Sequence, residues 1–200
     1  MFGFNTKTRL AMLAALSLFG CAHEHVPQTT LHPELAVVRI ASARGGLNPG
    51  CGFLISAHGL LVTTRRLVSS GTPVNVTLSD GRTLSATFVE EDQDADVALL
   101  RIPGDSFPFL HLGNDDIEPV MHIRVVGPTG LSHGIFDRWE NSGQAIGFTA
   151  RVTAADSGAP LLADDGTVIG VVREPSPDAA SAQLATPIWH VTRMVPIEAK

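Results

Sequence analysis

Short apolar runs separated by turn residues follow one another along the chain from residue 35 onward. The runs are rich in Val, Ile, Leu and Thr, which is typical of β-strands, and a helical period is nearly absent. They cover residues 36–41, 52–56, 60–64, 74–78, 83–89, 97–102, 122–126, 144–152, 160–162 and 167–172. Only residues 188–197 could hold a short helix. The pattern predicts an all-β fold, either a barrel or a sandwich.

The turn residues predict two hairpins in particular. The letters SDGR at 79–82 join one pair of runs, and the letters DDG at 164–166 join another pair. Glycine adopts the positive φ angles that tight hairpin turns require, and aspartate accepts hydrogen bonds from the turn backbone. In each pair the two strands are therefore expected to be antiparallel neighbours.

The first 34 residues differ from the rest of the chain. Lys7 and Arg9 precede an apolar run at 10–19, which is too short for a membrane-spanning helix of about 20 residues. The run ends in the letters LFGC at 18–21, which resemble the lipoprotein box of bacteria. This resemblance implies that residues 1–20 form a signal peptide and that Cys21 is lipidated. The alternative is an ordinary secretory signal with an incidental cysteine.

Both interpretations predict export to the bacterial cell envelope. Ala22 after the cysteine resembles enterobacterial sorting to the outer membrane, which implies a lipid anchor there on the periplasmic side. Residues 21–34 include three histidines and lack an apolar period, so we expect a solvated tether. The histidine spacing fits no familiar ligand pattern, and no metal is predicted. Residues 35–200 remain for the folded domain.

Composition and charge exclude several classes of protein. Lys+Arg 14 against Asp+Glu 20 gives a net charge of −6, and no basic block is longer than a pair, which argues against a nucleic-acid surface. A hydrophobic content of 44% with 17% charged residues excludes bulk disorder. The two cysteines, Cys21 and Cys51, cannot build a disulfide scaffold, and Cys51 is expected to be a small buried core residue.

One string indicates chemistry. The letters DSGAPLL at 156–162 resemble the G-[DN]-S-G-G-P-L-L segment around the nucleophile of trypsin-like serine proteases. In that family the serine lies in a tight loop whose backbone N–H groups converge on the oxyanion that forms during attack. The resemblance therefore implies that this segment derives from the nucleophile loop of a serine protease.

Other segments resemble HtrA/Deg-type bacterial proteases and occur in the order found in that family. These segments are residues 50–63, 74–83, 94–102, 109–115, 123–130 and 184–188. The resemblance implies two six-stranded antiparallel barrels with the active site in the cleft between them. It also implies that Leu184, Ala185 and Thr186 lie on the strand beside the specificity pocket.

The resemblance assigns the catalytic positions residue by residue. Ser157 falls on the nucleophile and Asp96 on the carboxylate of the triad, but the position of the general base holds Arg66. An arginine side chain stays charged at any ordinary pH and cannot take a proton from a serine. A buried carboxylate without its histidine needs another partner. We expect Asp96 to pair with the Arg66 guanidinium, or else to accept backbone N–H groups.

The oxyanion loop, residues Ala155, Asp156 and Gly158 around the serine, also departs from the family. Glycines normally stand two residues before and two residues after the nucleophile, where this chain has Ala155 and Ala159. Alanine reaches the backbone angles that glycine offers only at a cost of about 1 kcal/mol. Three departures at the chemistry, within a scaffold that persists, predict a relative without peptidase activity.

Three functional hypotheses follow. The first is an envelope lipoprotein that no longer cleaves peptide bonds and binds a peptide or a partner protein in the former active-site cleft by strand addition, without a small-molecule cofactor. The second is an active serine endopeptidase that uses Ser157 and Asp96 with an unrecognised base. The histidines available for that role, all in segments that the family does not direct at the nucleophile, are His58, His111, His122, His133 and His190. The third is a purely structural envelope component.

Overall fold

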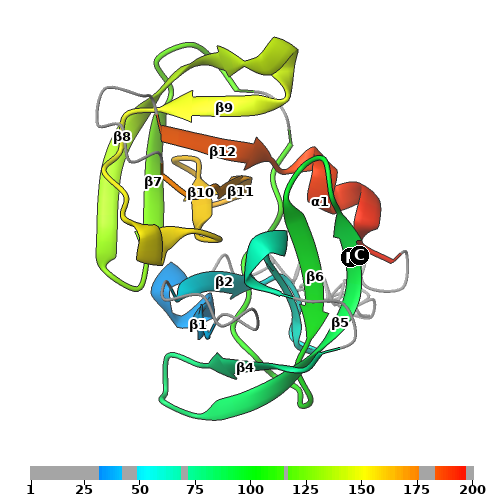
Figure 1. The fold of residues 1–200 in the computed structure, drawn as a ribbon. Helices are drawn as coiled ribbons and strands as arrows, with labels where there is room; N and C mark the ends of the chain where they lie inside the picture. The colour runs from blue at the N-terminus through cyan, green and yellow to red at the C-terminus, as the bar shows by residue number, and fades with distance from the viewer. Residues whose placement is uncertain (1–31, 42–48, 69–71, 115–116, 176–182, 197–200) are drawn as a thin grey trace, which may run out of the picture.

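The computed structural model describes residues 32–41, 49–68, 72–114, 117–175 and 183–196, and these residues form two closed antiparallel β-barrels (Figure 1). The first barrel has the strand order β1-β2-β3-β6-β5-β4. Its strands are β1 (Val37–Ile40), β2 (Gly50–Leu54), β3 (Leu60–Thr64), β4 (Val74–Thr77), β5 (Thr83–Asp92) and β6 (Val97–Arg101).

The second barrel has the order β10-β11-β12-β9-β8-β7. Its strands are β7 (His122–Gly127), β8 (Gly130–Glu140), β9 (Ala145–Phe148), β10 (Pro160–Leu162), β11 (Val168–Val172) and β12 (Gln183–Pro187). The short helices of the described residues are η1 (Pro33–Ala36), η2 (Arg65–Leu67), η3 (Asn141–Gly143), η4 (Ala154–Asp156) and α1 (Trp189–Met194). The predicted all-β class and the double six-stranded barrel are both confirmed.

The apolar run of β3 shows how the two barrels share their cores. All of its residues are buried, and successive side chains point to opposite faces of the strand. Leu61 belongs to the cluster that fills the first barrel, together with Leu54 and Leu100. Leu60 and Val62 belong to the cluster that continues into the second barrel. Burial on both faces explains why this run is continuously apolar rather than alternating.

The two predicted hairpins are present. In the first, β4 pairs with β5 from Val74 opposite Ala86 to Thr77 opposite Thr83. In the second, β10 pairs with β11, with Pro160 opposite Val171. The helix expected near the C-terminal end is α1, which packs against β5 and β6 of the first barrel although it follows the second barrel in the chain (Figure 1). None of the helices within the described ranges is long and apolar enough to cross a membrane.

The strand β8 is absent from the list of predicted runs. Only Phe136 of its eleven residues is buried, and the others are exposed or half-buried. A strand whose side chains mostly face solvent has no alternation of apolar and polar residues for a pattern to detect. Its position follows instead from its ladders with β7 and β9. The predicted targeting segment, with Cys21, lies outside the described residues.

Candidate active site

Ser157 lies directly after η4, at the point where the second barrel meets β2 of the first. Its carbonyl oxygen accepts the backbone N–H of Cys51 at 2.9 Å. The next residue, Gly158, has φ +91°, and a Cβ there would stand 2.0 Å from the Cys51 carbonyl oxygen. Only glycine fits this close approach of two chains. Ser157 itself has 0% of its surface exposed, so the serine is covered.

Two side chains from the first barrel contact the Ser157 hydroxyl, Arg66 and, at 3.5 Å through its own hydroxyl, Thr64. Arg66 belongs to η2, the turn that follows β3, and its Nε donates to the Ser157 Oγ at 3.2 Å. Its Nη1 lies 3.2 Å from the Glu174 carboxylate, and 25% of the side chain is exposed. Its Nη2 is buried without a hydrogen-bond partner among the described residues. The base position of the triad is therefore filled by a group that donates to the serine and cannot accept its proton.

Asp96 lies in the turn between β5 and β6, with φ +56°. Its Oδ1 accepts the backbone N–H of Arg66 at 3.2 Å, and its carbonyl accepts the backbone N–H of Arg65 at 3.1 Å. The expected pair between the Asp96 carboxylate and the Arg66 guanidinium is wrong, because the guanidinium turns toward Ser157 and Glu174. The other expected role, acceptance of backbone N–H groups, is what Asp96 performs.

Burial dominates the electrostatics of Asp96. Desolvation raises the pKa of its carboxyl group, against the opposing effects of the Arg66 backbone N–H and of the charges on Arg66, Arg173 and Arg65. In an ordinary triad a histidine donates its Nδ1–H to this carboxylate and stabilises the negative charge. Here the neighbouring arginines only partly replace that stabilisation.

Arg173 is a site residue that the sequence did not single out. It follows β11, and its Nε donates to Thr186 Oγ1 at 2.8 Å while its Nη2 donates to the Gln144 carbonyl at 3.0 Å. Thr186 in turn donates to the Ala95 carbonyl at 2.7 Å, beside Asp96. Burial lowers the pKa of Arg173, and Asp96 opposes that shift. The available signal was a charged residue placed directly after the apolar run 167–172.

The predicted pocket strand is β12. Ala185 and Thr186 are buried, and Leu184 is half-buried. Ala185 lies opposite Val172 of β11, and Thr186 lies opposite Val171. The hydrogen bonds of Thr186 therefore join this strand to the Asp96 turn of the first barrel.

The loop before Ser157 uses its own N–H groups. The Ser157 N–H donates to the Ala154 carbonyl at 3.3 Å, so η4 is a closed turn. The Gly158 N–H donates to the Val172 carbonyl at 2.8 Å, and the Ala159 N–H donates to the backbone carbonyl of Asp156 at 2.9 Å. An oxyanion hole needs the N–H of the nucleophile to be free and aimed at the substrate. In this conformation the Ser157 N–H is instead bonded to the Ala154 carbonyl within the loop.

The Asp156 carboxylate points away from Ser157 and stabilises this closed turn. It is buried and accepts hydrogen bonds from Thr129 Oγ1 at 2.8 and 3.0 Å. It also accepts the backbone N–H and the hydroxyl of Thr153, both at 2.8 Å. Thr153 and Asp156 form a capping box around η4, which fixes the first turn of the short helix.

None of the histidines in the described residues replaces the missing base. His58 lies 3.0 Å from Asp105 on the surface, and His190 lies 3.0 Å from Asp92 beneath α1. His111 packs edge-on against Phe109. His122 lies opposite Ile135 and His133 lies opposite Arg124 in the β7–β8 ladder, and neither histidine forms a hydrogen bond with Ser157. Within the same described residues, no cluster of three or more His, Cys, Asp or Glu could hold a metal ion.

Cys51 is close to Ser157 but is not a nucleophile. It is fully buried, and desolvation raises the pKa of its thiol far above the ordinary range, with a smaller contribution from the Asp156 charge. The thiolate is the reactive form of cysteine, so this thiol is inert at neutral pH.

Comparisons with known proteins agree with this geometry. A family model described as a trypsin-like peptidase domain matches residues 50–171, the segment that contains Arg66, Asp96 and Ser157. The chain is 32% identical over 134 residues to a probable periplasmic serine endoprotease, DegP-like, of Halomonas elongata, which covers 61% of this chain and 28% of that protein. It is 33% identical over 140 residues to the mitochondrial serine protease HTRA2 of Drosophila willistoni, which covers 61% of this chain and 32% of that protein.

A longer match is found with the serine protease HTRA1B of Danio rerio. The identity is 29% over 165 residues, which covers 74% of this chain and 35% of that protein. The chain thus spans about a third of the length of the curated relatives that it matches.

Proposed function

The chain belongs to the family of trypsin-like peptidase domains, with HtrA-type serine proteases among its relatives, and from this premise we propose that it is a pseudo-protease. It is exported and lipid-anchored at Cys21, and the face around Ser157 binds a peptide or a partner protein instead of cleaving it. The observation that carries the proposal is the contact of Arg66 Nε with Ser157 Oγ at 3.2 Å.

Loss of the general base is the largest energetic obstacle to catalysis. In the serine protease subtilisin, loss of the catalytic histidine alone lowers kcat about a millionfold. This factor corresponds to about 8 kcal/mol of transition-state stabilisation. The closed loop at η4 removes a further contribution, because one oxyanion donor stabilises the transition state by about 3–4 kcal/mol. The fold is kept while both terms are lost, which supports a binding role.

The envelope location is part of the proposal. Periplasmic proteases are among the relatives, and the lipoprotein-like letters at 18–21 support an anchor at the membrane. The relatives are about three times as long as the matched segment, so their activities and partners are not carried over to this chain.

A fluorophosphonate probe tests the proposal, because it labels a serine only when a base and an oxyanion hole activate it. We expect no labelling of the purified chain, with the Ser157→Ala variant as the matched blank and an active trypsin-like protease as the positive control. Labelling that Ser157→Ala abolishes would instead support an active endopeptidase with an unrecognised base.

A second measurement separates binding from a purely structural role. Immobilised chain is screened against a random peptide library, and the recovered peptides are tested on the Leu184→Glu variant. Leu184 lies half-buried on β12, so a peptide bound beside this strand would lose affinity on Leu184→Glu. Leu131→Glu, at the exposed start of β8, would not change the affinity. A purely structural component would recover no peptide.

A further inference from the structure

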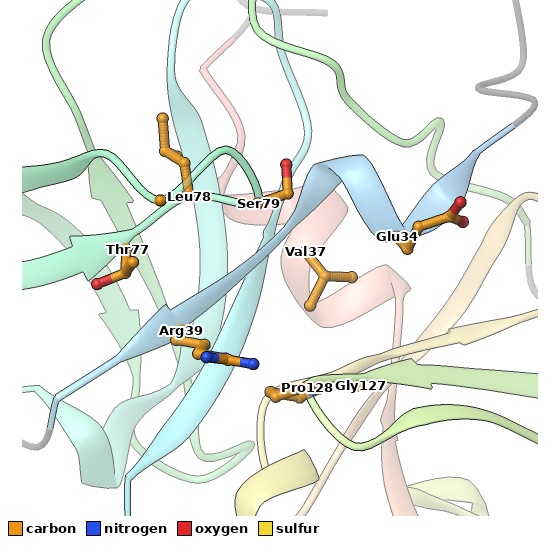
Figure 2. A pocket seen from close by; sticks show the side chains of 9 residues that line it. Glu34, Val37, Arg39, Thr77, Leu78, Ser79, Gly127 and Pro128 are labelled. Carbon is orange, nitrogen blue, oxygen red and sulfur yellow. The ribbon is translucent and has the colours of Figure 1, made fainter.

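A hollow of about 280 Å³ is lined by residues of both barrels (Figure 2). One wall is the N-terminal segment with Val37 and Arg39, and a second is the end of β4 with its turn. The third wall is the β7–β8 turn, Gly127 and Pro128 of the second barrel. We call this hollow the rear pocket. It is distinct from the Ser157 site, and nothing in the pseudo-protease proposal uses it.

Arg39 is the charged group of the rear pocket that lacks a partner. Its side chain is exposed, and Figure 2 shows it extending toward Pro128. The guanidinium makes no hydrogen bond or ion pair with the rest of the described chain. Glu34, the acid of the same pocket, is instead 3.0 Å from His32. The Arg39 guanidinium therefore has no counter-ion among the described residues and is available to a ligand.

The other polar groups of the pocket are already occupied. The Ser79 hydroxyl donates to the Leu35 carbonyl at 3.0 Å, and the Thr77 hydroxyl lies 3.2 Å from that of Thr83. The rest of the lining is apolar, with Val37, Leu78 and Pro128. The pocket therefore presents one free guanidinium beside a small apolar surface.

The unpaired guanidinium and the small volume of the pocket indicate the chemical class of its ligand. The planar guanidinium fork matches a carboxylate, to which it can donate two parallel hydrogen bonds. The volume of 280 Å³ lies below the range of about 300–1,000 Å³ that buries a drug-sized molecule. We propose that the rear pocket binds the C-terminal carboxylate of a peptide chain that ends in a small apolar residue. The carboxylate pairs with Arg39, and the last side chain packs on Val37 and Pro128.

The rear pocket is connected to the Ser157 loop by three residues. Gly127 lines the pocket, and a Cβ at this position would stand within van der Waals overlap of the Asp156 carboxylate. Two residues further, Thr129 holds that carboxylate with its hydroxyl. An occupant that touches Gly127 and Pro128 therefore restrains the turn that positions the residue before Ser157.

Titration of the purified full chain tests the proposal, with backbone amide chemical shifts as the readout. The probes are acetyl-Ala-Ala-Val with a free C-terminus, the same peptide as its amide, and 3-methylbutanoate as a free small acid. We expect the acid peptide to bind at least about tenfold more tightly than the amide, the margin of a charge-assisted hydrogen bond. Shifts should appear at Val37 and Gly127, which line the pocket, and extend to Thr129 and Ser157.

Two variants make the test specific. Arg39→Gln should lower the affinity for the acid peptide to that of the amide. Arg82→Gln should leave it unchanged, because Arg82 belongs to the same β4–β5 turn but pairs with Asp80. Equal affinity for acid and amide, or an unchanged affinity of Arg39→Gln, would overturn the site. Binding of 3-methylbutanoate as tight as that of the peptide would overturn the peptide terminus as the source of the carboxylate.

Discussion

Two charged residues near Ser157 do not perform the catalytic roles that their positions in the family suggest. Arg66 stands where a proton acceptor belongs and donates to the serine through Nε. Asp96, which would orient an imidazole, instead accepts the backbone N–H of the same arginine. The guanidinium is thereby free to reach the Glu174 carboxylate. The Arg66 side chain therefore bridges Ser157 and Glu174 and is not the counter-ion of the Asp96 carboxylate.

Arg66→Ala should lower the free energy of unfolding by about 1–2 kcal/mol. The substitution removes one hydrogen bond to a buried hydroxyl and one ion pair whose glutamate is 44% exposed, and exposed pairs contribute little. Urea denaturation measures the effect, with Arg138→Ala in a surface ion-pair cluster as the control. A loss of about 3–5 kcal/mol would mean that the guanidinium does neutralise a buried carboxylate.

Asp96 predicts a dependence of stability on pH. Its pKa is raised in the folded protein, so the folded state binds a proton more tightly than the unfolded state. The stability contributed by protonated Asp96 is then fully present below the unfolded pKa of about 4, and it is lost as the pH rises through the folded pKa. Asp96→Asn cannot ionise, and its amide oxygen can still accept the Arg66 N–H.

The expected result is that Asp96→Asn and the wild type are equally stable at strongly acidic pH and that the variant is more stable at neutral pH. Urea midpoints across this range measure the difference, and Asp164→Asn on an exposed turn is the control. A variant that is less stable than the wild type at neutral pH would show that the surrounding arginines stabilise the charged form after all.

At the level of elements, the closed turn η4 is an obstacle to catalysis that is independent of Arg66. Its capping box and the internal N–H of Ser157 hold the loop in one conformation. A single substitution at the base position therefore restores only part of the machinery. Base and oxyanion donors act on the same transition state, so their effects are expected to be more than additive.

We predict that Arg66→His alone gives at most feeble hydrolysis of an activated ester and no measurable cleavage of casein. Arg66→His combined with Ala155→Gly should exceed the product of the two single changes, because glycine lets the loop rotate an N–H toward the substrate at about 1 kcal/mol less cost than alanine. Ester hydrolysis and casein cleavage are measured on all three variants, each with Ser157→Ala added as the blank. Cleavage of casein by the wild type that Ser157→Ala abolishes would contradict the prediction.

A strand is predicted best from the sequence where the side chains on both of its faces are buried. The run 60–64 is unmistakable because its side chains fill two clusters, whereas β8 contributes only Phe136 to the core and leaves no pattern. The catalytic positions are found from strings of residues, but the direction of the Arg66 side chain is not. That direction depends on Glu174 and Ser157, which lie 108 and 91 positions away in the sequence, on the other barrel.

On the scale of the whole molecule, the site exists only where the barrels meet. Arg66 and Asp96 come from the first barrel, and Ser157 and Arg173 come from the second. The cluster that contains Leu60 and Val62 packs the two barrels against each other. Because a packed core is rigid, it also holds the residues around Ser157 in place. A binding face that is preformed in this way needs little reorganisation to accept a partner.

The lipid anchor proposed at Cys21 would determine where this face is presented. If Cys21 is lipidated, the processed chain should enter the detergent phase in a phase-separation experiment on bacterial membranes. A single acyl chain binds membranes only weakly, and the several acyl chains of a bacterial lipoprotein anchor it stably. Mass spectrometry of the N-terminus should find Cys21 as the first residue, with residues 1–20 removed.

Cys21→Ser separates lipidation from ordinary secretion. The variant lacks the thiol that carries the lipid, so it should either remain unprocessed at the inner membrane or appear as a soluble periplasmic protein. Cys51→Ser is the matched control, because Cys51 is buried in β2 and lies outside the predicted signal segment. A wild-type chain that is already soluble in the periplasm would refute the lipid anchor. In that case the predicted tether at 21–34 could not hold the Ser157 face near a membrane, and the proposed partner would have to be a periplasmic peptide or protein that diffuses freely.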